Sequence, residues 1–97
     1  PEYTAFINAV TGWNWTPMDI MKVGERIYNL ERMFINREGF AGKDDTIPKR
    51  FTETPMPEGP SKGRTVKLSE MLSDYYRQRG WEDGKPTPAK LKQLEIP

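Results

Sequence analysis

The fold is decided by the stretch of residues 16–38, which reads TPMDIMKVGERIYNLERMFINRE. Thr16 followed by Pro17 is typical of a helix start, because a threonine hydroxyl can cap the first free amides and proline fits the first helical position. Asp19 adds a carboxylate to the first turn, where the helix dipole favours it. Apolar residues then recur at spacings of three and four, which predicts one long helix ending near Glu38. This stripe consists of Ile20, Val23, Ile27, Leu30 and Phe34, widened by Met21, Tyr28 and Ile35.

Three shorter helices are predicted on either side of this segment. Residues 2–11 and 68–79 both carry apolar residues at helical spacing, and a glycine follows each of them. Thr87 and Pro88 repeat the signal of a capping residue before proline and open a short C-terminal helix. The apolar residues of these helices are Tyr3, Phe6, Ile7, Val10, Leu68, Met71, Leu72, Tyr75, Tyr76, Leu91 and Leu94.

Residues 39–66 contain eight prolines and glycines, too many for a long regular element. We expect an irregular loop with one short helical turn near 48–51. A connection this long is either disordered or an arm that lies on another surface, with Ile47, Phe51 and Met56 as candidate anchors. The predicted fold class is all-α: a single small helical domain, residues 1–97, of three main helices, a short C-terminal helix and this long Pro/Gly-rich loop.

The composition argues against several classes of partner. Fifteen basic and fourteen acidic residues leave a net charge of +1, so the chain lacks the positive field that binds nucleic acid or anionic lipid. No apolar run is long enough to span a membrane, and no signal peptide is readable. We therefore expect a soluble cytoplasmic protein. Pro1 in place of an initiating methionine suggests a piece of a larger protein.

The chain has no cysteine and no histidine, which removes disulfides, thiolate nucleophiles, Cys/His zinc sites and the usual neutral-pH general base. Asp44 and Asp45 form an adjacent acidic pair that a hard cation could use. They lack the alternate-position spacing of a calcium loop, and an acidic pair in a loop more often caps a turn or a helix. We favour the capping role.

The remaining charged and aromatic residues are interpreted as structural. Charged residues along a long helix usually form surface pairs, although Glu31 or Arg32 lies near enough to the apolar stripe to join an ion pair with another element. Tyr75 and Tyr76 sit within a helical stripe, which favours a core role over stacking on nucleic-acid bases. The charged residues of this helix are Arg26, Glu31, Arg32, Arg37 and Glu38, among others.

Several segments of the sequence closely resemble the C-terminal region of the aldehyde ferredoxin oxidoreductase family. The matching segments are GERIYNLERMF (24–34), NREGF (36–40), KDDTIP (43–48), RF (50–51), PMPEGP (55–60) and YYRQRGW (75–81). The resemblance starts near NAVTG (8–12) and continues almost to the C-terminus, in the expected order.

The resemblance implies an enzyme that oxidises aldehydes to carboxylic acids with water as the oxygen source. Such enzymes use a tungsto- or molybdopterin and a [4Fe–4S] cluster that passes electrons to ferredoxin. The family's cluster cysteines, in a C-x-x-C-x-x-x-C run and a D-x-x-G-L-C segment, are expected before the first residue of this chain. No catalytic, cofactor-binding or metal-binding residue is therefore nominated here.

The role implied for this chain is structural, as part of a helical wall around the buried cofactors and in contact with the remaining domains of its own polypeptide. Apolar faces that meet those domains should then be exposed, and the piece alone should self-associate. The alternative is a free-standing helical adaptor that shares ancestry with this region and binds a partner protein through its arm and aromatic face.

Overall fold

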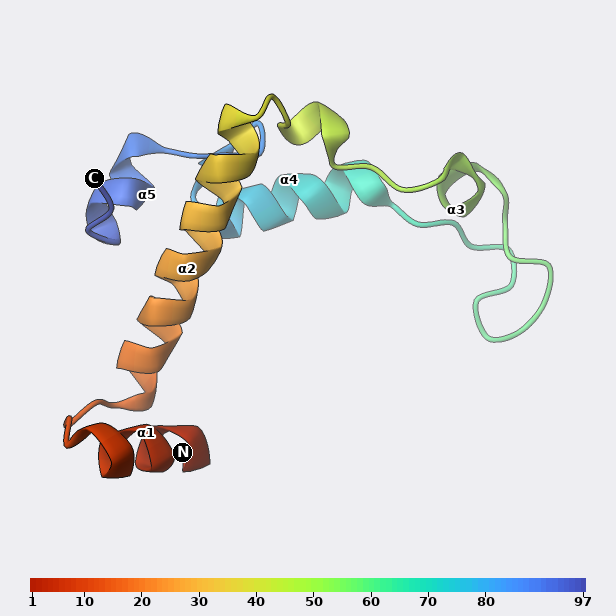
Figure 1. Ribbon diagram of the computed structural model, residues 1–97. Coiled ribbons are helices and arrows are strands. Elements are labelled where there is room, and N and C mark those ends of the chain that lie inside the picture. Colours follow the sequence, from red (N-terminus) through yellow and green to blue (C-terminus); the bar gives the residue numbers. More distant parts are fainter.

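The computed structural model describes all 97 residues and is built around one long helix, α2 (Pro17–Arg37). The rest of the chain adds four shorter helices and one minimal hairpin (Figure 1), so the predicted mostly helical fold is confirmed. The other elements are α1 (Glu2–Thr11), the 3₁₀ turn η1 (Gly42–Asp44), α3 (Lys49–Glu53), α4 (Leu68–Arg79), β1 (Trp81–Glu82), β2 (Lys85–Pro86) and α5 (Pro88–Gln93).

The connection between α1 and α2 is a fixed elbow. The Asn8 side chain donates to the carbonyl of Trp15 and accepts from its amide, both at 2.9 Å, and the Trp13 and Trp15 rings stack with centroids 4.5 Å apart. The predicted cap is confirmed as a reciprocal capping box, in which the Thr16 amide donates to the Asp19 carboxylate at 2.7 Å and the Asp19 amide donates to the Thr16 hydroxyl at 3.3 Å.

The connection between α2 and α4, residues 39–66, forms an arm that extends away from the rest of the chain (Figure 1). The short helix predicted near 48–51 is present as α3. The amide of Val66 donates to the carbonyl of Phe51 at 2.9 Å, so the arm folds back on itself beyond α3. Of the proposed anchors, Ile47 is half-buried whereas Phe51 and Met56 are exposed, and contact of the arm with another surface remains a prediction.

One element was absent from the sequence-based prediction. Trp81–Glu82 and Lys85–Pro86 pair as an antiparallel hairpin, and both turn residues, Asp83 and Gly84, have positive φ. Asp-Gly is a strong signal for such a turn. The prediction missed it because each strand has only two residues, too few to show an alternating pattern.

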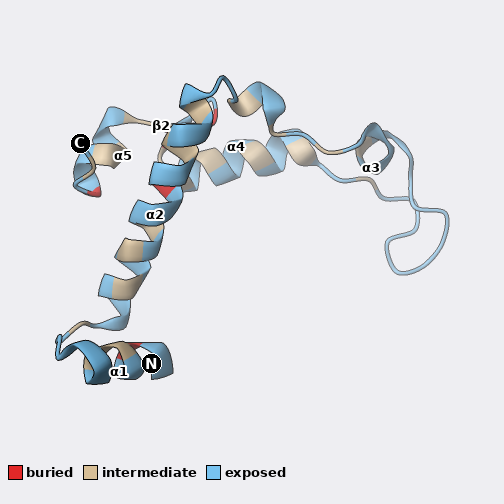
Figure 2. Cartoon of the chain, in the orientation of Figure 1, coloured by how far each residue is buried: buried red, intermediate tan, exposed pale blue.

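The chain is far from compact. Its radius of gyration is 18.2 Å, whereas a compact chain of this length has about 13 Å. Its accessible surface is 7964 Å², against about 5,700 Å² for a monomeric protein of this mass. Only five residues are buried, and exposed positions dominate every helix (Figure 2). Taken alone, these residues do not enclose a core of normal size.

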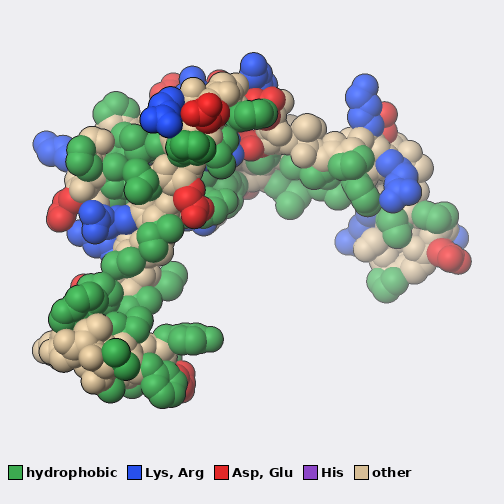
Figure 3. Space-filling view, viewed as in Figure 1, with side chains coloured by type: hydrophobic (Ala, Val, Ile, Leu, Met, Phe, Trp, Pro, Cys, Tyr) green, Lys and Arg blue, Asp and Glu red, His purple; other side chains and the backbone are tan.

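The exposed surface is rich in large apolar side chains. Figure 3 shows them along α1 and the adjoining part of α2. The exposed residues include Tyr3, Phe6, Val10, Trp13, Met18, Met21, Ile27, Leu30, Phe34, Ile35, Phe40 and Met71. This confirms the expectation that apolar faces remain open. No helix is both long and apolar enough to cross a membrane.

We predict that residues 1–97 alone self-associate in water, because contiguous apolar patches of this extent drive association. Sedimentation velocity over a range of concentrations should show a weight-average mass that rises with concentration. A monomer at every concentration, with a sharp cooperative thermal transition, would contradict the prediction.

Candidate functional site

The best-packed part of the molecule surrounds Trp81, at the junction of α2, α4 and the hairpin. The Trp81 indole N–H donates to the side-chain oxygen of Asn29 at 2.7 Å, and the Asn29 amide group donates to the carbonyl of Glu25 at 2.8 Å. Asn29 is 0% exposed and is the only fully buried large side chain. A buried amide is costly without partners, so this pairing is what permits an asparagine at the centre.

Aromatic rings enclose Trp81 on several sides. Tyr28 stacks on it with centroids 5.9 Å apart, and Tyr75 meets it edge-on at 5.7 Å. Tyr76 lies at 6.2 Å in a tilted arrangement. These are the separations that favour aromatic pairs. Tyr75 and Tyr76 thus pack against the buried Trp81, as anchors that are themselves only partly covered, with Tyr75 still 36% exposed.

A second layer of the site is charged. Arg32 forms an ion pair with Asp45, its Nη1 lying 3.0 Å from Oδ1, and its Nε donates to the carbonyl of Gly84 at 2.7 Å. The guanidinium carbon also sits 5.0 Å from the Trp81 ring centroid. The Tyr76 hydroxyl donates to the same Asp45 carboxylate. Arg32 thereby connects α2 to the start of the arm and to the hairpin.

Only glycine fits at position 84, the second residue of the hairpin turn. A Cβ on Gly84 would lie 2.6 Å from the Arg32 guanidinium and 2.6 Å from the Gly42 backbone nitrogen. The Gly42 amide in turn donates to the carbonyl of Asp83 at 2.9 Å. The turn is thus pressed directly against α2 and the arm.

A second set of ion pairs links α2 to α4 and α5. Glu25 pairs with Arg79 at the end of α4, and its other carboxylate oxygen lies 3.4 Å from the Lys90 ammonium group. The Arg79 guanidinium also lies 4.6 Å from the Tyr28 ring centroid. All three charged side chains are largely shielded from water, so the pairs are screened less than surface pairs.

The residues described above form one group, the Trp81 cluster, and its ionisation follows from these contacts. Its members are Glu25, Tyr28, Asn29, Arg32, Asp45, Tyr75, Tyr76, Arg79, Trp81 and Lys90. Burial raises the pKa of Asp45, but hydrogen bonds from Arg32 and Tyr76 outweigh it and bring that pKa below its ordinary value. Burial and the hydrogen bond to Asp45 raise the pKa of Tyr76 to about 12. At neutral pH Asp45 is therefore an anion and Tyr76 a neutral donor.

The two faces of α2 are used in an unusual way. Its part-buried polar contacts within this chain come from Glu25, Asn29, Arg32 and Asn36, which follow one another at spacings of four, three and four, and Tyr28 stacks on Trp81 beside them. At about 100° per residue they share one side of the helix. The apolar stripe from Ile20 to Phe34 lies on the opposite side, so α2 turns a polar face to its own chain and an apolar face outward.

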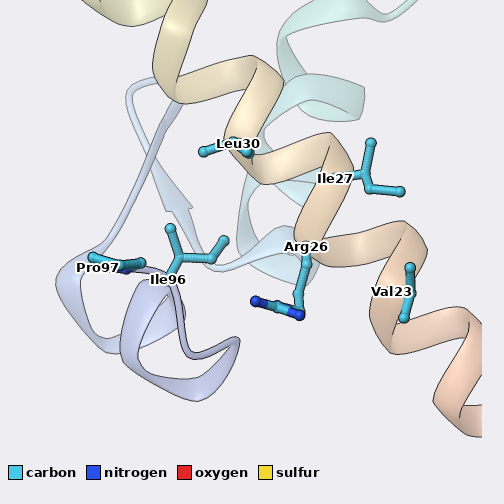
Figure 4. A pocket seen from close by; sticks show the side chains of 6 residues that line it. All are labelled: Val23, Arg26, Ile27, Leu30, Ile96 and Pro97. Atoms are coloured by element: carbon cyan, nitrogen blue, oxygen red, sulfur yellow. The ribbon is translucent and has the colours of Figure 1, made fainter.

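A hollow lies between α2 and the C-terminal tail. It is a groove of about 280 Å³, and Figure 4 shows Leu30 and Ile96 on its two sides. Arg26 is the single charged residue that lines it, and no carboxylate, hydroxyl or amide side chain does. The groove therefore suits apolar packing.

The structure assigns places to the residues considered from the sequence. Asp44 accepts from the Ala41 amide at 3.0 Å, as expected of a capping residue, and Asp45 lies in the ion pair with Arg32. The predicted inter-element pair thus exists at Arg32. Arg37 and Glu38 form an exposed pair. The sequence does not single out Asn29, because the role of an asparagine within a helix can be assigned only when its partner, here Trp81, is known.

The chemistry that the Trp81 cluster can support is limited. Each of its carboxylates is held by a cation, and no buried side-chain nitrogen or oxygen lacks a hydrogen-bond partner. The contacts join α2, α4, α5, the hairpin and the start of the arm. This arrangement is suited to fixing these elements relative to one another.

The sequence of this chain matches a known protein family along almost its whole length. The family model described as aldehyde ferredoxin oxidoreductase, domains 2 & 3, matches residues 1–96. The chain belongs to the aldehyde ferredoxin oxidoreductase family. It is 54% identical over 97 residues to the tungsten-containing aldehyde ferredoxin oxidoreductase of Pyrococcus furiosus. The enzymes of that name from Pyrococcus horikoshii and Thermococcus kodakarensis are 53% and 50% identical to it.

These alignments cover 98% of this chain but only 16% of each relative. The chain therefore spans about one-sixth of the length of the aldehyde ferredoxin oxidoreductases that it matches. The Trp81 cluster, with all of its residues between 25 and 90, belongs to this shared segment.

We predict that Asn29→Ala destabilises the full-length protein by about 1–3 kcal/mol, because it leaves the buried Trp81 indole N–H without an acceptor. Denaturant unfolding of the full-length protein measures the loss. Asn14→Ala, at an exposed position, is the matched control and should change stability little. Equal effects of the two substitutions would contradict a structural role for Asn29.

We also predict how the stability of the full-length protein changes in acid. Because the folded-state pKa of Asp45 is lowered, its contribution to stability is present above about pH 4 and is lost as pH falls through the folded-state value. Asp45→Asn cannot titrate, so the stability difference between wild type and variant should be large at pH 7 and shrink below pH 4. Chemical denaturation across this range measures it.

Asp74→Asn is the control for this experiment, since Asp74 forms an exposed pair with Arg77. It should give a small difference at every pH. A difference for Asp45→Asn that does not change with pH would show that the carboxylate charge is not what stabilises the cluster.

Proposed function

We propose that the full-length protein is an aldehyde:ferredoxin oxidoreductase. It converts an aldehyde and water to a carboxylic acid, releasing two protons and two electrons that pass to ferredoxin. The observation that carries the proposal is the family match over residues 1–96 together with 54% identity to a tungsten-containing relative. We further propose that the enzyme is cytoplasmic.

Within that enzyme, we propose that residues 1–97 form a single C-terminal helical domain in which residues 39–66 are an irregular arm. Its task is to support the parts of the enzyme that hold the cofactors, and it is inactive alone. The Trp81 cluster supports this role, because it joins five segments and leaves no charged group free for proton transfer.

The family's cofactors are a tungsto- or molybdopterin and a [4Fe–4S] cluster, and the donor groups of this chain do not fit the cluster. Iron–sulfur clusters are held by cysteine thiolates, with histidine as the occasional substitute. This chain has neither residue. We therefore propose that the ligands of the cluster lie elsewhere in the polypeptide.

Metal analysis and visible absorption, on protein prepared without oxygen, test the proposal. The full-length protein should contain tungsten or molybdenum together with iron and should reduce ferredoxin with an aldehyde. Residues 1–97 alone should contain none of these metals and show no activity. A colourless, metal-free full-length protein would overturn the proposal and leave a helical interaction adaptor as the alternative.

A further inference from the structure

We propose that the outward face of α2, around Gly24, is a close-packing seat for the remainder of the same polypeptide, whose backbone approaches the helix at this glycine. The seat consists of Ile20, Gly24, Ile27, Phe34 and the adjoining apolar face of α1. The proposal rests on the proposed function, since it assigns the surface by which this segment joins the rest of the enzyme.

The seat is exposed in this chain. Ile27 and Phe34 are 55% and 58% exposed, although they lie on the most regular apolar stripe of the chain. The opposite side of α2 already holds Asn29 and Arg32 in the Trp81 cluster. The helix cannot turn its stripe inward without breaking those contacts, and the C-terminal Ile96 and Pro97, which line a groove with Ile27, still leave Ile27 and Phe34 more than half exposed. The stripe is therefore open to a cover from outside this chain.

Gly24 stands inside a helix, where glycine is unfavourable. Glycine inside a helix costs about 0.5–1 kcal/mol relative to alanine. Other glycines of the chain have local reasons, such as the positive φ of Gly80 at the end of α4 and the crowding at Gly84. Gly24 is helical, and a Cβ placed on it would meet nothing within 4 Å. A backbone packed against this side of α2 would account for the glycine.

The extent of the exposed apolar surface favours the remainder of the polypeptide over a second copy as the occupant. The exposed apolar residues lie on α1, on α2 and on Met71 of α4, so they face more than one direction. A second copy related by a two-fold axis covers one patch, about 800 Å² per partner in a typical interface. The surface in excess of a compact chain is larger than that. The relatives carry roughly five times as much chain outside this segment, enough to cover all these faces.

The sign of one substitution tests the seat. In open space Gly24→Ala would raise the thermal midpoint of the full-length protein, because alanine favours the helix. If a backbone packs there, Gly24→Ala lowers the midpoint, and the bulkier Gly24→Leu lowers it further. Ser73→Ala, at an exposed position of α4, is the control for helix propensity and should leave it unchanged or raise it. An increase for Gly24→Ala would overturn the proposal.

Methionine oxidation gives a test that needs no variant. Met21 lies three residues before Gly24, at the edge of the seat, and is 66% exposed in this chain. In the native full-length protein, peroxide should oxidise Met21 at least about tenfold more slowly than in the unfolded protein, as mass spectrometry of peptides can show. Oxidation at the unfolded rate would overturn the proposal.

Dilution separates the two possible occupants. Protection that persists when the full-length protein is diluted to a monomer supports the remainder of the same polypeptide. Protection that disappears on dissociation would assign the seat to a second copy and overturn the proposal. Neither measurement reads activity, so a failure here leaves the proposed oxidoreductase function intact, and a metal-free protein would refute that function without moving these results.

Discussion

The rest of the structure depends on the hydrogen bond between the Trp81 indole and the Asn29 side chain. This bond places the first residue of the hairpin against the middle of α2. The hairpin turn then offers its Gly84 carbonyl to Arg32, and Arg32 holds Asp45 at the start of the arm. One buried polar contact therefore sets the position of segments that lie more than fifty residues apart in the sequence.

These contacts fix the relative positions of the segments, but they contribute little to the free energy of unfolding. Hydrogen bonds contribute about 1 kcal/mol each after the loss of water is counted, and buried ion pairs often add little beyond the cost of desolvating them. Only Trp81 and Leu94 are large apolar residues buried in this chain. The main favourable term in folding, apolar burial, must then come from surfaces that this chain leaves open.

The parts of the fold that sequence reasoning predicted are those with local signals. Thr16 and Asp19 specify a helix start through contacts within one turn, so their pattern could be read directly. Asn29 and Asp45 were not assigned partners, because Trp81 and Arg32 reach them from elsewhere in the chain. The ion pair of α2 with another element was expected, yet only the three-dimensional arrangement identified Asp45 as its acceptor.

The apolar pattern of α2 illustrates the same limit more sharply. Periodicity showed correctly which side of the helix is apolar, and a natural reading would bury that side against neighbouring helices of the same chain. The structure instead buries the polar side, at Asn29 and Arg32, and leaves Ile27 and Phe34 open. Periodicity reports the need for a cover and is silent on what provides it. A helix that is polar toward its own segment and apolar toward the outside gains apolar burial mainly from a cover outside that segment, and that is the role we propose for the remainder of the polypeptide.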